Sequence, residues 1–445
     1  MQRRRSGRGI VVAICAWTAV VASWSTGCGS LRAQNNRSTA AAPGWRAIAS
    51  APVAERIFAT AIWTGREMIV WGGGAASEGG RRGLPTDGAA YDPSRNLWRP
   101  IAAAPLAGRV GHTAIWTGRQ MIVWGGAGVS DEPDSFDPSA DPDAAPPAKE
   151  DPGPFADGAA YDPQRNSWQP IAAAPLAGRV SHTAVWTGQE MIVWGGNGWS
   201  DQDDGAFADG AAFDPRRNSW RRLAAAPIDP RAGHTALWTG QAMIVWGGIG
   251  RDPSAVGDDR TTQPERGDGA IYDPARDVWR ALGSPLTPQD PDHDWGLLDF
   301  AHHAVWTGRE MITWGGSLLR GGAYEPSTGT WRGIATSPLG EGSGGPSGDR
   351  ETIANIVGSG TTMVWTGEQV LIWGGSDAGA KRPHGAAYDP GTNRWTSIPT
   401  RDPFVRSRHV AVWTGDDMVV WGGFRSPDGD VFTGDFSGAA YRPPQ

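Results

Sequence analysis

Two loop segments combine a tryptophan with neighbouring carboxylates, which are residue types that recognise sugars. An exposed aromatic ring stacks on a sugar ring, while carboxylates accept hydrogen bonds from its hydroxyl groups. Carboxylates also hold calcium, but the segment from Asp201 to Gly205 lacks the full EF-hand pattern, so we predict no metal site. The alternative is that both tryptophans only pin their loops to the domain rim. The candidate ligand-binding residues are Trp199, Asp201, Asp203, Asp204, Asp292, His293, Asp294 and Trp295.

Arginine and histidine recur at fixed distances before a tryptophan that ends a short apolar run. The arginine lies seven residues before this tryptophan and the histidine four residues before it, each in five copies. If the copies surround an axis, these side chains form a ring at a channel mouth that could bind an anion. The repetition favours the alternative that each hydrogen-bonds the backbone of a neighbouring copy. The channel-mouth candidates are Arg109, Arg179, Arg231, Arg406, His112, His182 and His234.

Common catalytic signatures are absent from the sequence. There is no GxSxG elbow, no HExxH pair and no close cysteine cluster, so the usual hydrolase and zinc sites are excluded. The recurring Gly-Gly pairs follow apolar runs without the lysine and helix start that a phosphate loop needs. We therefore assign no catalytic residue and no cofactor.

An internal repeat positions all these residues. The stretch WTGxxMIVWGG occurs seven times with little variation, and successive copies start 48 to 70 residues apart, at Trp63, Trp116, Trp186, Trp238, Trp306, Trp365 and Trp413. Each copy belongs to two apolar runs, here called strands a and b. A GAAYDP-like strand c and a strand d centred on tryptophan belong to the same repeat unit. Four antiparallel strands recurring at this period predict a β-propeller blade.

The two ends of the chain complement each other. Strand c occurs seven times, but strand d follows it only six times, because the chain stops at Gln445. The missing copy matches residues 44–48, GWRAI, ahead of the first strand a. We therefore predict an all-β, seven-bladed propeller over residues 44–445, in which an N-terminal strand completes the last blade and leaves no open sheet edge.

The double glycine after strand b, the aromatic-Asp-Pro of strand c and the tryptophan of strand d resemble the kelch repeat. The pattern is similar to the central domain of galactose oxidase and covers residues 44–445. Copper-radical chemistry of that kind is disfavoured, because all six tyrosines lie in strand c and no cysteine follows Cys28. The resemblance implies a fold that hosts binding proteins, oxidases and sugar isomerases, so it leaves the function open.

The long insertions gather on one face. Connections a–b and c–d emerge together and are short in every copy, so we name that side the minimal face. Connections b–c and d–a emerge on the opposite side, which we name the elaborated face. Its long segments are 74–87, 127–157, 197–209, 249–268, 283–299, 335–357 and 424–437. Binding is expected there, because function concentrates in variable loops.

The N-terminus predicts export. Four arginines precede an apolar run from Ile10 to Trp24, which is too short for a spanning helix and typical of a signal peptide over residues 1–27. Thr26-Gly27-Cys28 resembles the bacterial lipobox, although Ser25 replaces the usual leucine. Residues 28–43 would then be a lipidated cysteine and a flexible tether. The alternative is an ordinary secretory signal, so we expect a bacterial envelope lipoprotein or a secreted protein.

The net charge of the chain argues against one class of binding partner. Removing residues 1–27 takes away four arginines and no acid, so the formal net charge falls from −7 to −11, and nucleic acid is not an expected partner. We expect a monomer that touches the membrane only through its lipid and binds a protein or a glycan. The alternative is a carbohydrate-active enzyme, an isomerase or lyase, with Asp292, His293 and Asp294 as acid and base and an arginine of the channel-mouth ring as anion holder.

Replacing Cys28 with serine tests the anchor. Without the thiol no lipid can be attached, so we expect the Cys28→Ser protein to move from the membrane fraction to the soluble fraction after cell lysis. Continued membrane fractionation of this variant would contradict lipidation at Cys28.

Overall fold

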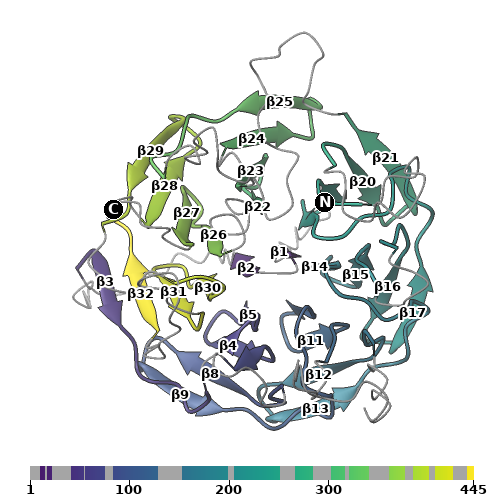
Figure 1. Ribbon diagram of the computed structural model, residues 1–445, viewed down its shortest axis with the longest axis horizontal. Helices are drawn as coiled ribbons and strands as arrows, with labels where there is room; N and C mark the ends of the chain where they lie inside the picture. The colour runs from purple at the N-terminus through teal and green to yellow at the C-terminus, as the bar shows by residue number, and fades with distance from the viewer. Residues whose placement is uncertain are drawn as a thin grey trace, which may run out of the picture.

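Seven antiparallel four-stranded sheets surround a central axis, with strand a innermost and strand d outermost (Figure 1). The predicted seven-bladed propeller with the kelch pattern is therefore confirmed. The computed structural model describes residues 11–15, 18–22, 42–54, 56–75, 84–128, 153–198, 205–250, 266–283, 302–315, 320–339, 360–375, 384–399, 406–423 and 438–444.

The inner two strands of each blade come from the WTGxxMIVWGG stretch. Strands a of blades 1 to 7 are β5 (Thr60–Trp63), β10 (Thr113–Trp116), β14 (Thr183–Trp186), β18 (Thr235–Trp238), β22 (His302–Trp306), β26 (Thr361–Trp365) and β30 (Val410–Trp413). Strands b are β6 (Met68–Trp71), β11 (Met121–Trp124), β15 (Met191–Trp194), β19 (Met243–Trp246), β23 (Met311–Gly315), β27 (Val370–Gly374) and β31 (Met418–Trp421).

The outer two strands follow the same order. Strands c are β8 (Gly88–Asp92), β12 (Gly158–Asp162), β16 (Gly210–Asp214), β20 (Gly269–Asp273), β24 (Arg320–Glu325), β28 (Gly385–Asp389) and β32 (Ala439–Arg442). Strands d are β9 (Leu97–Pro100), β13 (Ser167–Pro170), β17 (Ser219–Arg222), β21 (Val278–Leu282), β25 (Thr330–Gly333), β29 (Arg394–Ser397) and, in blade 7, β3 (Gly44–Ala47). Blade 1 also contains a short pair, β4 (Arg56–Ile57) with β7 (Gly74–Ala75).

Local turn chemistry explains why one face is minimal. In the a–b turn of blade 1, Thr64 Oγ1 accepts the N–H of Glu67 at 2.8 Å, and Gly65 adopts φ 92°, a conformation that favours glycine. In the c–d turn, Asp92 Oδ1 accepts the N–H of Ser94 at 3.0 Å, and Asn96 takes the left-handed conformation at φ 48°. Equivalent turns recur in other blades, so these connections stay short.

The N-terminal strand closes the ring as predicted. In β3, Gly44 pairs with Arg442 and Ala47 with Ala439 of β32, so the blade that holds the C-terminal strands receives its outer strand from the start of the domain. Arg46 of β3 donates a hydrogen bond of 2.7 Å to Asp417, whose side chain is 5% exposed. Asp417 also accepts the Arg442 guanidinium at 2.8 Å, so one carboxylate holds strands from both ends of the chain.

Tryptophans link each blade to the one before it. The ring of each strand d tryptophan packs on a strand b tryptophan of the preceding blade, as in Trp168 on Trp71 at 5.6 Å and Trp98 on Trp421 at 5.6 Å. Trp45 of β3 packs on Trp373 at 4.3 Å and so completes this set at the closure. Such contacts contribute about 0.5–1.5 kcal/mol each beyond the area they bury.

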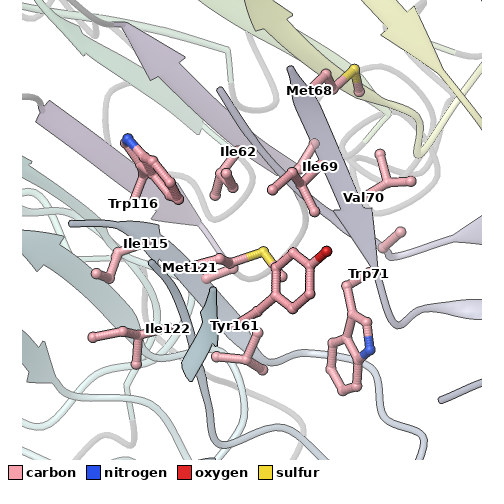
Figure 2. Close-up of a cluster of buried hydrophobic side chains, with 14 of the residues drawn as sticks. Ile62, Met68, Ile69, Val70, Trp71, Ile115, Trp116, Met121, Ile122 and Tyr161 are labelled. Carbon is pink, nitrogen blue, oxygen red and sulfur yellow. The ribbon is translucent and has the colours of Figure 1, made fainter. Parts of the chain in front are cut away.

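The interior between blades is tightly filled and apolar. Figure 2 shows Ile62, Ile69 and Trp71 of blade 1 beside Ile122 and Tyr161 of blade 2. These side chains are at most 1% exposed. Consecutive alanines in strand c, such as Ala89 and Ala90, are buried on both faces of the sheet, and their small side chains allow the blades to approach closely.

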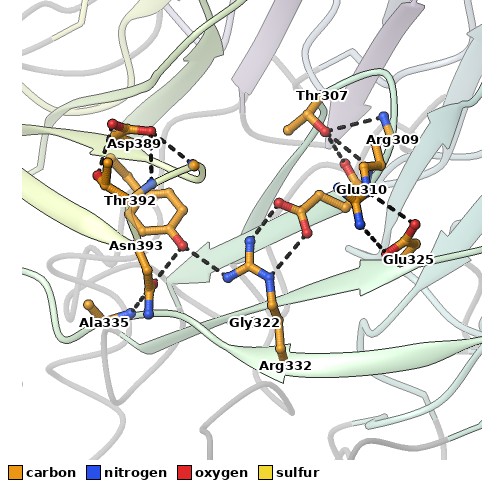
Figure 3. A network of polar contacts seen from close by, with 12 residues as sticks. Thr307, Arg309, Glu310, Gly322, Glu325, Arg332, Ala335, Asp389, Thr392 and Asn393 are labelled. Carbon is orange, nitrogen blue, oxygen red and sulfur yellow. Dashed lines mark hydrogen bonds and ion pairs between the residues drawn. The ribbon is translucent and has the colours of Figure 1, made fainter. Parts of the chain in front are cut away.

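Near the minimal face, a salt bridge in every second blade also contacts the next blade. In Figure 3 Arg332 of blade 5 holds Glu310 of its own blade at 2.6 Å and donates to Tyr388 Oη of blade 6 at 3.2 Å. The same three-part contact occurs in blades 1 and 3, through Glu67, Arg99 and Tyr161 and through Glu190, Arg221 and Tyr272. Blade 7 has the corresponding Asp417 and Arg46. Blades 2, 4 and 6 lack the acid, with Gln120, Ala242 and Gln369 in its place.

The N-terminal apolar run forms a hairpin of β1 (Val11–Cys15) and β2 (Thr18–Ala22) near the axis, beside inner strands that include β14, β18 and β30 (Figure 1). This hairpin lies in the segment predicted to be cleaved as a signal peptide, and that cleavage stays a prediction. The described residues contain no helix long and apolar enough to cross a membrane.

Asp417→Asn should weaken the closure of the ring. The mutation leaves Arg46 and Arg442 without their shared carboxylate, so we expect a loss of about 1–3 kcal/mol in the free energy of unfolding, measured in urea at pH 7. Burial alone would raise the pKa of Asp417, but hydrogen bonds from Arg46 and Arg442 lower this pKa overall. The stabilisation is therefore present above the unfolded pKa of 3.8 and lost as the pH falls through the folded pKa.

The matched control is Asp416→Asn, because the Asp416 side chain is 82% exposed and lies 3.8 Å from Arg442. We expect this neighbouring change to alter the unfolding free energy by less than about 0.5 kcal/mol. Equal losses in the two variants would contradict the role of Asp417 in closure.

Candidate functional site

The elaborated face is where the described ends of strands a, b and c meet the long connections. Arg56, Arg109, Arg179, Arg231 and Arg406 precede strands a, and each side chain is buried. The ring of arginines expected from the spacing is therefore present at this end of the inner strands. Its contacts decide whether it can bind a ligand.

Each of the first four arginines is neutralised within its own blade. The guanidinium of Arg109 donates to the carbonyl of Gly125 at 3.0 Å, at the end of strand b, and to Asp157 Oδ1 at 2.8 Å, just before strand c. The Arg109 side chain is 0% exposed and the Asp157 side chain 57%. The matching pairs are Arg56 with Asp87, Arg179 with Asp209 and Arg231 with Asp268.

These arginines therefore act as internal struts of a blade. Each binds the backbone of its own blade, which differs from the expected contact with a neighbouring blade. In blades 2 and 3 a phenylalanine covers the guanidinium, with Phe155 at 4.4 Å from Arg109 and Phe207 at 4.2 Å from Arg179. The group that faces solvent is the aspartate. A repeated Asp-Gly at the start of strand c, as in Asp157-Gly158, was the sequence signal for this partner.

The histidines connect neighbouring blades. Nε2 of His182 in blade 3 lies 3.0 Å from Thr113 Oγ1 in blade 2, and the same His–Thr contact occurs at four other junctions. The other pairs are His112 with Thr60 at 2.9 Å, His234 with Thr183 at 2.8 Å, His302 with Thr235 at 3.3 Å and His409 with Thr362 at 2.8 Å. These imidazoles are struts between blades.

Burial keeps these imidazoles neutral. Desolvation, reinforced by the nearby arginine, lowers the pKa of His112, His182 and His409 to about 3, and lowers that of His234 well below its ordinary value. A group that stays neutral down to this pH cannot exchange a proton with a substrate near neutrality. The channel-mouth histidines are thus unsuited to acid–base catalysis.

At the junction of blades 7 and 1, several positions of the repeat carry different residues. At this junction the His–Thr pair is replaced by Ala59 of blade 1 and Val410 of blade 7, which are both buried. The residue before the histidine position adopts a left-handed conformation and is small in blades 2 to 4, namely Gly111, Ser181 and Gly233. Blades 1 and 7 carry Phe58 and Arg408 there.

Phe58 and Arg408 form a strained, partly exposed pair at the mouth of the ring. Their φ angles are 58° and 57°, and the Arg408 guanidinium carbon lies 4.6 Å from the centre of the Phe58 ring. Bulky side chains in the left-handed region cost about 1–3 kcal/mol each, and such strain concentrates at functional sites. Burial lowers the pKa of Arg408, but this guanidinium remains charged at neutral pH. We name these two residues the seam pair.

The remaining sequence candidates lie outside the described residues. These are Trp199, Asp201, Asp203, Asp204, Asp292, His293, Asp294 and Trp295, together with Cys28. Their predicted roles stay predictions. Within the part of the chain that the structure describes, no group of three or more His, Cys, Asp or Glu side chains is placed to hold a metal ion.

Part of the chain is similar to known proteins. No family model matches the chain. The chain is similar to N-acetylneuraminate epimerases of two Haemophilus influenzae strains, PittEE at 26% identity and 86-028NP at 25% identity, each over 164 residues. The match covers 34% of this chain and 44% of each relative, so the chain spans less than half the length of these curated relatives.

The stability of the ring should fall as the histidines are driven to ionise. Since the folded pKa of His182 is about 3 and the unfolded value about 6.5, the unfolded chain binds the proton first. This contribution is complete above pH 6.5 and is lost as the pH falls towards 3. One such histidine accounts for about 2 kcal/mol between pH 7 and pH 5 by linkage.

His182→Gln should therefore flatten the decline in unfolding free energy between pH 7 and pH 5, measured by urea titration at each pH. Thr113→Val is the control, because it removes the partner hydroxyl but keeps the titrating ring. An unchanged pH dependence in His182→Gln would show that this imidazole does not stay neutral in the fold.

Proposed function

We propose that this protein is an exported, lipid-anchored binding propeller that takes an acidic sugar on its elaborated face, at the junction of blades 7 and 1. The observation that carries the proposal is the seam pair. Phe58 and Arg408 keep a costly left-handed backbone at the position where blades 2 to 4 have glycine or serine. Such a cost persists where another requirement sustains it, and ligand recognition is that requirement here.

The chemistry of the pair suits a sugar that carries a carboxylate. A phenyl ring offers an apolar face to the C–H groups of a sugar ring. A guanidinium binds a carboxylate through parallel hydrogen bonds. The two matched relatives are named for N-acetylneuraminate, which has this combination of groups, and this supports an acidic sugar over a neutral one.

Binding is favoured over catalysis by the state of the described titratable groups. The channel-mouth histidines are buried with a pKa of about 3 or well below the ordinary value, and the arginines are held by aspartates of their own blades. The epimerase name of the relatives supports the alternative, a sugar isomerase. In that case Asp292, His293 and Asp294 would have to supply the acid and the base.

The location follows from the N-terminal sequence. A lipid on Cys28 and the tether of residues 28–43 would hold the propeller at a bacterial envelope membrane, where sugars of surface polymers are within reach. Secretion without an anchor is the alternative.

Arg408→Gly should weaken binding of N-acetylneuraminate at least tenfold, measured by isothermal titration with residues 44–445, because the loss of a charge-assisted contact to a carboxylate costs about 1.5–3 kcal/mol. Phe58→Gly should weaken binding by a smaller factor, because an aromatic contact contributes about 0.5–1.5 kcal/mol. Both variants restore the residue that Gly111 and Gly233 provide in other blades, so the fold should be retained or slightly stabilised.

Ser181→Gly makes the same backbone change in blade 3 and should leave binding unchanged. Equal affinity in Arg408→Gly and the unmodified protein would contradict the proposed site. Epimerisation of N-acetylneuraminate by the unmodified protein, followed by proton NMR, would instead favour the enzyme, and loss of this turnover in Asp292→Asn or His293→Gln would locate its chemistry.

A further inference from the structure

The tether leaves the propeller on the minimal face. Strand β3 begins at Gly44, which pairs with Arg442 at the end of β32. Strand c runs towards the c–d turn, so this end of the blade belongs to the minimal face. Residue 43 therefore lies on the side opposite the long loops.

The minimal face carries an excess of arginine over three adjacent blades. In blade 1 Arg66 and Arg95 share Asp92, at 3.5 and 3.8 Å, and in blade 2 Arg119 and Arg165 share Asp162, at 4.0 and 2.7 Å. In blade 3 Arg217 pairs with Asp214 at 2.7 Å beside the exposed Arg216. We name these six arginines, Arg66, Arg95, Arg119, Arg165, Arg216 and Arg217, the basic arc.

Each of these blades has one uncompensated positive charge in its turns. The pKa values of Asp92, Asp162 and Asp214 are lowered, because hydrogen bonds to the turn outweigh the opposing effect of burial, so these carboxylates are ionised at neutral pH. The arginine side chains in these ion pairs are 67–82% exposed, so their guanidinium groups face solvent. Two arginines per carboxylate leave one positive charge per blade.

The other blades do not share this excess. Blades 4 and 5 have one-to-one pairs, Arg276 with Asp273 at 2.7 Å and Arg309 with Glu325 at 3.0 Å, the latter visible in Figure 3. Blades 6 and 7 present the exposed acids Glu368 and Asp416 in their a–b turns. The positive charge is therefore local, in a chain whose formal net charge is −7.

An exposed leucine lies within the basic arc. Leu97 of β9 is 58% exposed and pairs in register with Asp92, the carboxylate between Arg66 and Arg95. Blades 2 and 3 have Ser167 and Ser219 at this position. An apolar side chain among arginines is the combination that enters the boundary between headgroups and acyl chains of a lipid bilayer.

We propose that the basic arc and Leu97 dock the minimal face on anionic phospholipid headgroups. The surface would lie under blades 1 to 3, and the elaborated face with its seam pair would point away from the membrane. The predicted lipid at Cys28 supplies proximity, because a tether that emerges on the same face keeps the arc near the bilayer. The arc extends the membrane contact beyond the lipid.

The test measures the arc without any lipid anchor. Residues 44–445 contain every strand of the seven sheets, so this chain is sedimented with vesicles of phosphatidylcholine, with and without one-third phosphatidylglycerol. We expect partitioning to the anionic vesicles only, falling steeply with added salt. Arg66→Gln, Arg119→Gln and Arg216→Gln together should lower it about a hundredfold, since each basic residue near such a surface contributes about 1 kcal/mol.

The matched control is the triple variant Arg276→Gln, Arg309→Gln and Arg394→Gln, which removes the same charge from exposed positions outside the arc. It should keep most of the partitioning, and Leu97→Ser should reduce it at constant charge. Equal losses in the two triple variants, or no preference for phosphatidylglycerol, would overturn the proposal. Since the measured chain lacks Cys28, an error in the anchor prediction would not change this result.

Discussion

The pairing of β3 with β32 is the contact on which the rest of the structure depends. Without it blade 7 would end in a three-stranded sheet with an open edge, and the last two blades would lose the Trp45–Trp373 contact. Asp417 adds a charge-assisted clasp, because its carboxylate binds Arg46 and Arg442 from opposite ends of the chain. Because β3 pairs with β32 and the chain then continues into blade 1, the pairing ties blade 7 to blade 1.

The repeated arginines and histidines hold the ring together. Each Arg–Asp pair closes the end of one blade, and each His–Thr pair joins two blades. Neutral imidazoles fit this role, since a charged ring buried beside a guanidinium would be strongly unfavourable. The proposed recognition site lies where the repeat is interrupted.

The fold could be predicted from the sequence because the repeat is long, occurs seven times and includes the residues that form its turns. Trp45 was assigned to the last blade from its pattern alone, and the pairing of β3 confirms that assignment. The partners of the arginines were less predictable. Whether Arg109 reaches its own blade or the next depends on the stagger and twist of the strands, which the spacing of residues does not contain.

Phe58 and Arg408 could have been found from the sequence by aligning the residue before each histidine position, where Gly111, Ser181 and Gly233 are small. The backbone angles were needed to recognise the strain at these two residues, because a bulky side chain is costly there only in the left-handed conformation. The loop candidates, such as Asp292 and His293, follow no repeat, so no register could place them relative to the channel mouth.

Closure of the ring and the proposed ligand site share one junction. Arg408 precedes strand a of blade 7 and Phe58 precedes strand a of blade 1, and these two blades become neighbours only when the ring is complete. The seam pair therefore cannot form in a partly folded chain. Because the same closure also places residue 43 on the minimal face, a single event assembles the site, fixes the side from which the tether emerges and turns the site away from it.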